Sequence, residues 1–181
     1  DALIRGGQWH RMLSSCFLHG GALHLASNSH ALHSLGTPVE QWFGSGRFAA
    51  VYALSGLSGN VLSLATGTAP LSVGASGAIF GLLGAWYVFL QQNRDFFESR
   101  GVDVSRTLGG MLQMCAVNAM FGLSPNSRVD NVCHVGGMLG GASCAFAFGP
   151  RLRRARGGIV DEPRLALPRH DRSASRRRQS R

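Results

Sequence analysis

The chain has 181 residues and a net charge of +9, and its 18 basic residues are all arginine. Eleven of these arginines and three acids lie from Arg151 onward, so residues 1–150 carry a net charge of only +1. A nearly neutral core argues against a nucleic-acid-binding domain. The basic surplus belongs to a tail, residues 150–181, which we expect to be disordered; the alternatives are a tail that binds anionic lipid or nucleic acid.

Five apolar stretches follow one another along the first 150 residues, with polar or glycine-bearing segments between them. They are residues 18–35, 48–66, 73–91, 107–123 and 133–148. Most approach the roughly 20 residues that a helix needs to cross a bilayer. We therefore predict an all-α fold, a polytopic bundle of transmembrane helices. The alternative is a soluble bundle of very apolar helices.

Small residues recur at helical spacing within these stretches. Gly77, Gly81 and Ala85 are four residues apart, and so are Gly137 and Gly141. Lipid provides no hydrophobic drive for helix association, so membrane helices often pack closely through such residues. The glycine spacing therefore favours the membrane interpretation.

Arginine placement predicts the orientation of the bundle. If the five stretches cross in turn, the loops 36–47 and 93–106 lie on the same side as the tail. That side holds 15 arginines, whereas the opposite side holds Arg5, Arg11 and Arg128. The tail side is therefore predicted to be the cytoplasmic side, or its equivalent in an organelle.

Ser76 is the first candidate for a functional site, because polar residues inside membrane spans are costly and tend to be functional. It lies in Gly74-Ala75-Ser76-Gly77 at the start of the third stretch. Small neighbours leave the hydroxyl accessible, and a helix N-terminus offers free backbone N–H groups for an oxyanion. The plain alternative is a capping or packing serine.

His134 begins the fifth stretch and is the candidate base. Alone it would be read as an interfacial histidine. The sequence after it places Gly137 and Gly141 near its helical face. If that face packs on Gly77 and Gly81, His134 comes within hydrogen-bond reach of Ser76.

A polar pair, His24 and Asn28, lies near the start of the first stretch and four residues apart, hence on one helix face. Alternate spans run in the same direction, so this pair, Ser76 and His134 are predicted to lie at one depth, away from the tail. Such a pair can donate hydrogen bonds to an oxyanion. A metal site built from His19, His24, His30 and His33 is the competing interpretation, but their spacing winds around the helix.

Together these segments resemble the rhomboid family of intramembrane proteases over roughly residues 7–150. The matching stretches are Trp9-His10-Arg11, residues 19–28 (HGGALHLASN), residues 74–81 (GASGAIFG) and residues 134–141 (HVGGMLGG). Glu40 to Gly44 resembles the family's short acidic turn. Residues 28–36 and Asp130-Asn131 look more like the plastid members of plants and algae, which implies a chloroplast envelope membrane.

The resemblance implies an intramembrane serine endopeptidase with a Ser76–His134 dyad, no cofactor and no metal. His24, Asn28 and the backbone at Gly74 and Ser76 would form the oxyanion hole. Phe80 would stack on the catalytic histidine, and the Arg11 region would belong to a membrane-embedded loop, residues 1–17.

The resemblance also bears on the fold and on partners. The family core has six helices, of which the first precedes the Trp9–Arg11 loop, so five are expected within residues 18–149. Substrates would be membrane proteins cleaved in or near their transmembrane helices, in contact with lipid. The alternative function is that of a non-catalytic relative that binds transmembrane clients.

Overall fold

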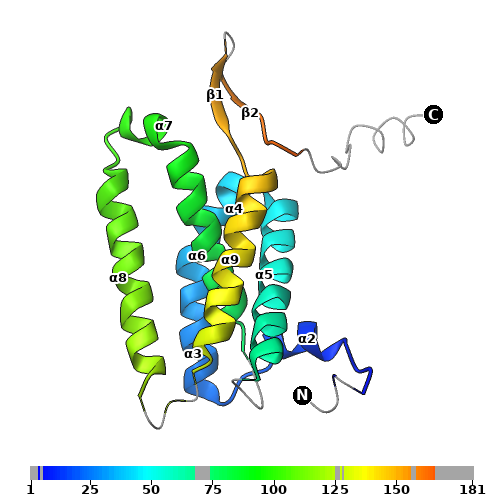
Figure 1. The fold of residues 1–181 in the computed structure, drawn as a ribbon. Helices are drawn as coiled ribbons and strands as arrows, with labels where there is room; N and C mark the ends of the chain where they lie inside the picture. Colours follow the sequence, from blue (N-terminus) through cyan, green and yellow to red (C-terminus); the bar gives the residue numbers. More distant parts are fainter. Residues whose placement is uncertain are drawn as a thin grey trace, which may run out of the picture.

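The computed structural model describes residue 4 and residues 6–67, 74–124, 127, 129–155 and 158–165. These residues are mainly helical, with one two-stranded hairpin after the last helix (Figure 1). The predicted all-α class is therefore confirmed. The helices of the N-terminal part are α2 (Arg11–Ser14), the 3₁₀ turn η1 (Ser15–Phe17), α3 (Ala22–Ala31), the π-helical turn η2 (Leu32–Gly36), α4 (Thr37–Phe43) and α5 (Ser45–Thr66). They are followed by α6 (Ser76–Gln92), α7 (Arg94–Glu98), α8 (Val104–Gly122), α9 (Asn131–Phe148), β1 (Leu152–Ala155) and β2 (Gly158–Asp161).

The first predicted span is longer than the sequence indicated. We expected a loop over residues 36–47, but α3, η2 and α4 form one helical segment from Ala22 to Phe43. Pro38 lies in the first turn of α4 and has no backbone N–H to donate to the preceding turn. That preceding turn, η2, is π-helical, so the helix continues with a changed hydrogen-bond pattern. Gly44, with a φ of +76°, then separates α4 from α5.

The first part of the tail is folded, so our expectation of disorder from residue 150 is wrong for these residues. β1 and β2 pair in antiparallel fashion. The side-chain oxygen of Asn93 accepts the Leu152 N–H at 2.6 Å, and its amide donates to the Pro150 carbonyl at 3.0 Å. Arg47 on α5 forms an ion pair with Asp161. These contacts fasten the hairpin to the ends of α5 and α6, whereas residues 166–181 lie outside the described residues.

Large apolar side chains fill the half of the bundle nearest the hairpin. Their buried cluster comprises Val39, Phe43, Val51, Leu82, Ala85, Phe89, Leu90, Phe97, Val104, Leu108, Ala145 and Phe148. Phe89 lies at its centre, 1% exposed, with the rings of Phe43 and Phe97 edge-on to it at 5.4 and 5.5 Å. This half of the bundle is held by the burial of large side chains.

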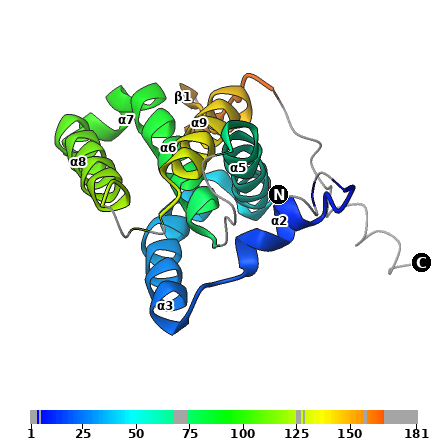
Figure 2. The same cartoon turned by 60° about the horizontal axis from the view of Figure 1, so that its bottom comes forward.

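Glycines pack the opposite half. Figures 1 and 2 show α9 alongside both α5 and α6, with α8 at the edge of the bundle. A Cβ added at Gly137 would collide with the Gly77 carbonyl oxygen, and one at Gly141 with the Gly81 carbonyl oxygen. The backbones of α6 and α9 therefore touch directly, the kind of contact that small residues permit between membrane helices.

Membrane character is clearest in α5. Among the described helices, it is the one whose length and composition suffice to cross a membrane. The first predicted span continues without a break into α4 but contains a π-helical turn, and α6 has 17 residues. α8 exposes a run of large apolar side chains, among them Leu112, Met120 and Phe121, as suits a lipid-facing helix.

The contact between α6 and α9 predicts that Gly141→Ala destabilises the protein. Its new methyl group would meet the backbone at Gly81, which cannot move aside, and overpacking of this kind costs about 1–3 kcal/mol. Gly109→Ala on α8 is the matched control, because nothing lies within 4 Å of its added Cβ. Thermal unfolding of the detergent-solubilised protein should show a lower midpoint for Gly141→Ala alone. Equal midpoints would contradict the close contact.

Candidate active site

Ser76 and His134 come together at the ends of α6 and α9. Ser76 is the first residue of α6, and His134 lies in the first turn of α9. His134 Nε2 is 2.9 Å from Ser76 Oγ. Asp130 caps α9 by accepting the Cys133 N–H at 2.9 Å, which fixes the turn that carries His134. The separation of His134 Nε2 and Ser76 Oγ suits proton transfer between a hydroxyl and an imidazole.

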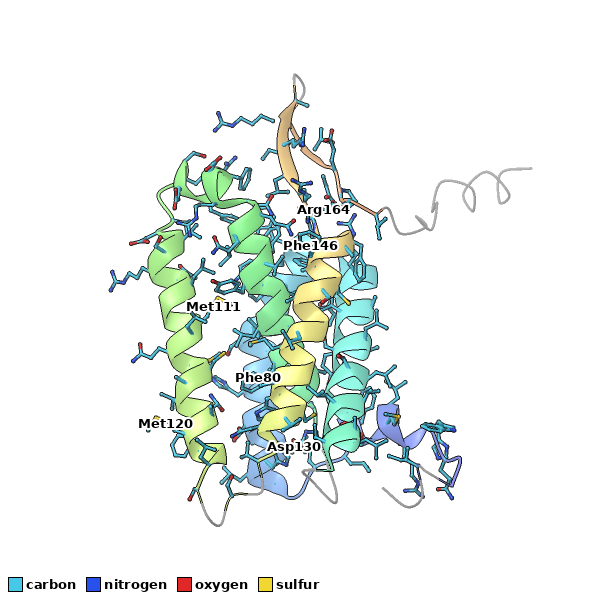
Figure 3. All side chains as sticks on the ribbon, viewed as in Figure 1. Phe80, Met111, Met120, Asp130, Phe146 and Arg164 are labelled. Atoms are coloured by element: carbon cyan, nitrogen blue, oxygen red, sulfur yellow. The ribbon has the colours of Figure 1, made fainter. Side chains whose placement is uncertain are left out.

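Phe80 holds the imidazole from one face. It lies one turn after Ser76 on α6, and its ring stacks on the His134 ring with centroids 4.1 Å apart and an interplanar angle of 9°. Figure 3 places Phe80 and Asp130 in the half of the bundle away from Phe146 and Arg164, which lie near the hairpin. Ring stacking restricts rotation of the imidazole and keeps Nε2 directed at Ser76.

His24 and Asn28, both on α3, lie against Gly74. A Cβ at Gly74 would be 2.8 Å from His24 Cε1, 3.0 Å from His24 Nε2 and 3.4 Å from Asn28 Nδ2. Gly74 also has a φ of +129°, which other residues rarely adopt. Glycine at this position therefore brings the polar face of α3 close to the turn that precedes Ser76.

Both side chains on α3 present a hydrogen-bond donor. The Gly20 N–H donates to His24 Nδ1 at 3.3 Å, so a neutral His24 carries its proton on Nε2, the nitrogen that faces Gly74. Asn28 Nδ2 is buried and has no partner among the described protein atoms. The Ser76 N–H lies in the first turn of α6, where a helix leaves such groups free.

Gly74 is placed differently from our expectation. The Gly74 N–H donates to the Ser15 carbonyl at 2.9 Å, so it is not available to an oxyanion. Gly74 instead leaves room for the side chains of His24 and Asn28, and its hydrogen bond to Ser15 ties the segment before Ser76 to η1. Arg11 lies on α2, within the segment predicted to be a membrane-embedded loop, and its exposed side chain donates through Nε to Gln8 Oε1 at 2.6 Å. Its membrane-embedded role stays a prediction.

No described carboxylate contacts the His134 ring. Asp130, the acid nearest in sequence, accepts the Cys133 N–H through one oxygen and the Ser63 hydroxyl through the other. Among the described residues, Ser76 and His134 thus form a pair without a third, acidic member. In a triad the acid orients the imidazole, whereas here the stacked Phe80 ring restricts it.

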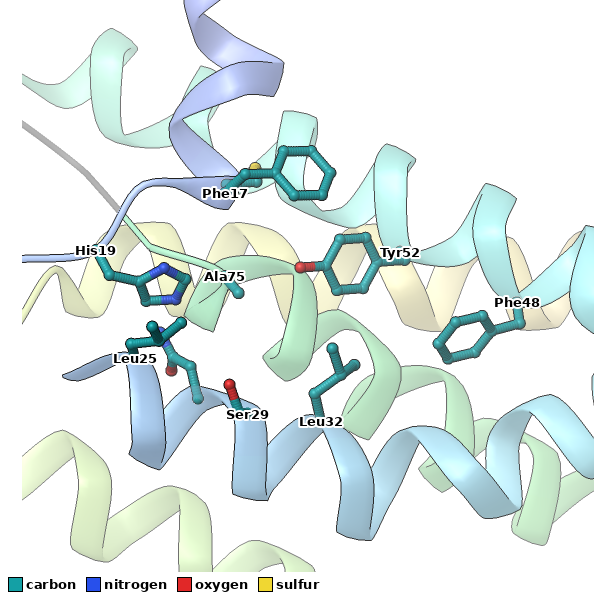
Figure 4. A pocket seen from close by; sticks show the side chains of 10 residues that line it. Phe17, His19, Leu25, Ser29, Leu32, Phe48, Tyr52 and Ala75 are labelled. Carbon is teal, nitrogen blue, oxygen red and sulfur yellow. The ribbon is translucent and has the colours of Figure 1, made fainter. Parts of the chain in front are cut away.

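Two cavities flank the dyad. The first, of about 370 Å³, lies between η1, α3 and α5, next to Ala75. Its lining residues are Cys16, Phe17, His19, Leu25, Asn28, Ser29, Leu32, Phe48, Tyr52 and Ala75. Figure 4 shows Tyr52 projecting from α5 toward Ala75, with the Ser29 hydroxyl on the opposite wall. The second, of about 280 Å³, lies between α6, α8 and α9 and is lined by Phe80, His134 and Cys115, among others.

Sequence reasoning missed two polar residues near the site. His19 was considered only as a ligand of the competing metal site, yet its ring lies edge-on to His24 with centroids 5.3 Å apart, and its Nε2 is buried without a described partner. Asn60 was overlooked in the middle of α5, although a polar residue within an apolar span is itself a signal. Its contacts reach both the η1 turn and α9.

Comparison with known proteins identifies the family. The rhomboid domain family matches residues 6–151. The chain belongs to the rhomboid family. Its helices therefore form a rhomboid-type helical membrane fold, and the protein is an integral membrane protein.

Three rhomboid relatives illustrate the similarity. Rhomboid protease GluP of Bacillus subtilis is 41% identical over 82% of this chain and 28% of its own length. RHOMBOID-like protein 5 of Arabidopsis thaliana is 37% identical over 93% of this chain and 52% of its own. RHOMBOID-like protein 9, chloroplastic, of the same plant is 33% identical over 86% of this chain and 35% of its own. The chain thus spans between roughly a quarter and half of the length of these relatives.

The stacking of Phe80 predicts that Phe80→Leu slows the reaction of Ser76 with a fluorophosphonate probe. Leucine keeps the apolar contact but not the parallel ring face, so the imidazole gains freedom and Nε2 is less often aimed at Ser76. We expect a labelling rate about tenfold lower, within the range that misplaced catalytic groups cost. Phe146→Leu, near the far end of α9, is the control. Equal rates in the two variants would show that stacking does not orient His134.

Proposed function

We propose that this chain carries the catalytic core of an intramembrane serine endopeptidase. It hydrolyses peptide bonds in or beside the transmembrane helices of membrane protein substrates, with Ser76 as nucleophile and His134 as general base. The observation that carries the proposal is the 2.9 Å separation of His134 Nε2 and Ser76 Oγ, under a stacked Phe80. A hydroxyl paired with an oriented imidazole is the requirement for covalent catalysis by serine.

The proposed reaction has two halves. In the first, His134 Nε2 takes the Ser76 proton as Oγ attacks the scissile carbonyl, and then returns it to the leaving amine. This step leaves an acyl-enzyme on Ser76. In the second, water attacks the ester with His134 again as base, which releases the new carboxyl end and restores the hydroxyl.

Charge on the carbonyl oxygen would be stabilised by three donors. These are His24 Nε2–H, Asn28 Nδ2–H and the Ser76 N–H. Asn28 Nδ2 is buried without a described partner, and both α3 side chains lie at the Gly74 turn, two residues before the nucleophile. Donors that are already fixed in place stabilise the transition state without reorganisation.

The cavity beside Ala75 is the proposed site for the substrate side chain next to the scissile bond. It opens against the residue that precedes the nucleophile and shares Asn28 with the oxyanion donors. Its wall is mostly apolar, with hydroxyls from Ser29 and Tyr52. A substrate helix must unwind locally to reach the dyad, because its scissile carbonyl is otherwise hydrogen-bonded within the helix. Helix-breaking residues near the cleavage point should therefore favour hydrolysis.

We further propose a chloroplast envelope membrane as the location. It is supported by the likeness of residues 28–36 to plastid members and by the name of RHOMBOID-like protein 9, chloroplastic. Imaging of a fluorescent fusion of the full-length gene product tests this. Signal in mitochondria or the cell surface membrane would contradict it.

Replacing the nucleophile gives the direct test of the activity. We expect Ser76→Ala, in the full-length gene product reconstituted with a transmembrane reporter, to cleave at least a thousandfold more slowly, as losses of a catalytic serine generally do. His134→Ala should be equally inactive, because the two residues act as a unit. Equal cleavage by wild type and Ser76→Ala would end the proposal. Binding of reporter without cleavage or probe labelling in the wild type would favour the client-binding alternative.

Removing an oxyanion donor should reduce kcat and leave KM nearly unchanged. We expect His24→Ala and Asn28→Ala each to lower kcat about 10²- to 10³-fold, the usual cost of losing one such donor. His30→Ala is the control, since His30 is exposed at the end of the same helix. A similar kcat in all three variants would exclude this oxyanion site.

A further inference from the structure

Asn60 connects three separate elements through one amide group. It lies on α5, and its Nδ2 donates to the Met12 carbonyl and, at 2.9 Å, to Ser15 Oγ. Its Oδ1 accepts the Cys133 S–H at 3.7 Å. One side chain thus ties the segment of α2 and η1 to the start of α9. Such a group is costly to place in an apolar span unless its partners satisfy it.

The first set of contacts leads to the nucleophile. Asn60 bonds both ends of the short turn from Met12 to Ser15. The carbonyl of Ser15 in turn accepts the Gly74 N–H at 2.9 Å. Gly74 lies two residues before Ser76 and against His24 and Asn28. The position of the turn held by Asn60 therefore sets the position of the segment that leads into Ser76.

The second contact leads to the base. Cys133 is the residue directly before His134, and its thiol sits between α5 and α6. A Cβ would be 2.9 Å from Cys133 Sγ if added at Gly59, and 2.7 Å from it if added at Gly77. The hydrogen bond to Asn60 holds this thiol from the α5 side, and Cys133 lies in the first turn of α9, next to His134.

We infer that Asn60 is a positioning residue that sets the relative placement of Ser76 and His134. The inference rests on the proposed protease function. Asn60 touches neither reacting group. It holds the two backbones that carry them, through Ser15 and Gly74 on one side and Cys133 on the other. A shift of about 1 Å between catalytic groups can cost a hundredfold in rate.

The test is Asn60→Leu in the full-length gene product, reconstituted with the transmembrane reporter. Leucine keeps the size but loses every hydrogen bond of the amide. We expect kcat to fall 10- to 100-fold while KM changes less than twofold, because substrate contacts remain and geometry is lost. Val61→Ala is the control, since Val61 is the next residue and is 49% exposed. Thermal unfolding of both variants is measured alongside, and kcat is expressed per folded molecule.

Smaller changes keep the inference testable if Asn60→Leu unfolds. Cys133→Ala and Ser15→Ala each remove one partner, and each is combined with Asn60→Ala. We expect each double variant to be no slower than the slower of its two single variants, which is the sign of coupling through Asn60. Cys133→Ser keeps a donor and should lose less kcat than Cys133→Ala.

The outcomes separate this inference from the proposed function. If the wild type is active, Ser76→Ala is inactive and Asn60→Leu retains the kcat of Val61→Ala, Asn60 does not position the dyad. Additive losses in both double variants, or a fall in activity fully accounted for by loss of folded protein, contradict it as well. Cleavage that persists in Ser76→Ala would instead overturn the protease proposal itself.

Discussion

Direct backbone contact between α6 and α9 is the constraint on which the rest of the structure depends. Gly137 faces the Gly77 carbonyl and Gly141 faces the Gly81 carbonyl, with no room for a side chain at either crossing. Only this approach brings the first turn of α9 to the first residue of α6. The 2.9 Å distance between His134 Nε2 and Ser76 Oγ is thus a consequence of helix packing through glycine.

One end of the bundle holds most of the large buried side chains, and the other end holds the candidate active site. Near the hairpin, large side chains around Phe89 pack the helices together, and Asn93 and Arg47 fasten the hairpin across their ends. Near the dyad, glycines and polar groups replace large side chains, and Asn60, Asp130 and Gly74 fix the geometry by hydrogen bonds and close contact. The well-packed end supplies the burial that stabilises the fold. The site end, by contrast, holds Asn28 Nδ2 buried without a described partner, which is a costly arrangement.

The sequence allowed prediction of those features that depend on spacing. Glycines four residues apart on two stretches, with Ser76 and His134 at the matching ends, indicated which helix faces meet. Features that depend on local backbone geometry or distant pairing were not predictable. The helix continues past Gly36 through a π-helical turn that periodicity does not indicate. The arginine-rich composition of the tail gave no sign of the hairpin. The hairpin is held by partners far away in sequence, such as Arg47 with Asp161. The engagement of the Gly74 N–H by Ser15 likewise depends on a contact across 59 residues.

We propose that Ser76, His134 and the two donors on α3 form one site that reacts with a carbonyl. The most direct measurement is an experimental structure of the full-length gene product after reaction with a fluorophosphonate. We expect phosphorus bonded to Ser76 Oγ, with a phosphoryl oxygen within hydrogen-bond distance of His24 Nε2, Asn28 Nδ2 and the Ser76 N–H. An adduct on another residue, or a phosphoryl oxygen directed away from α3, would contradict it.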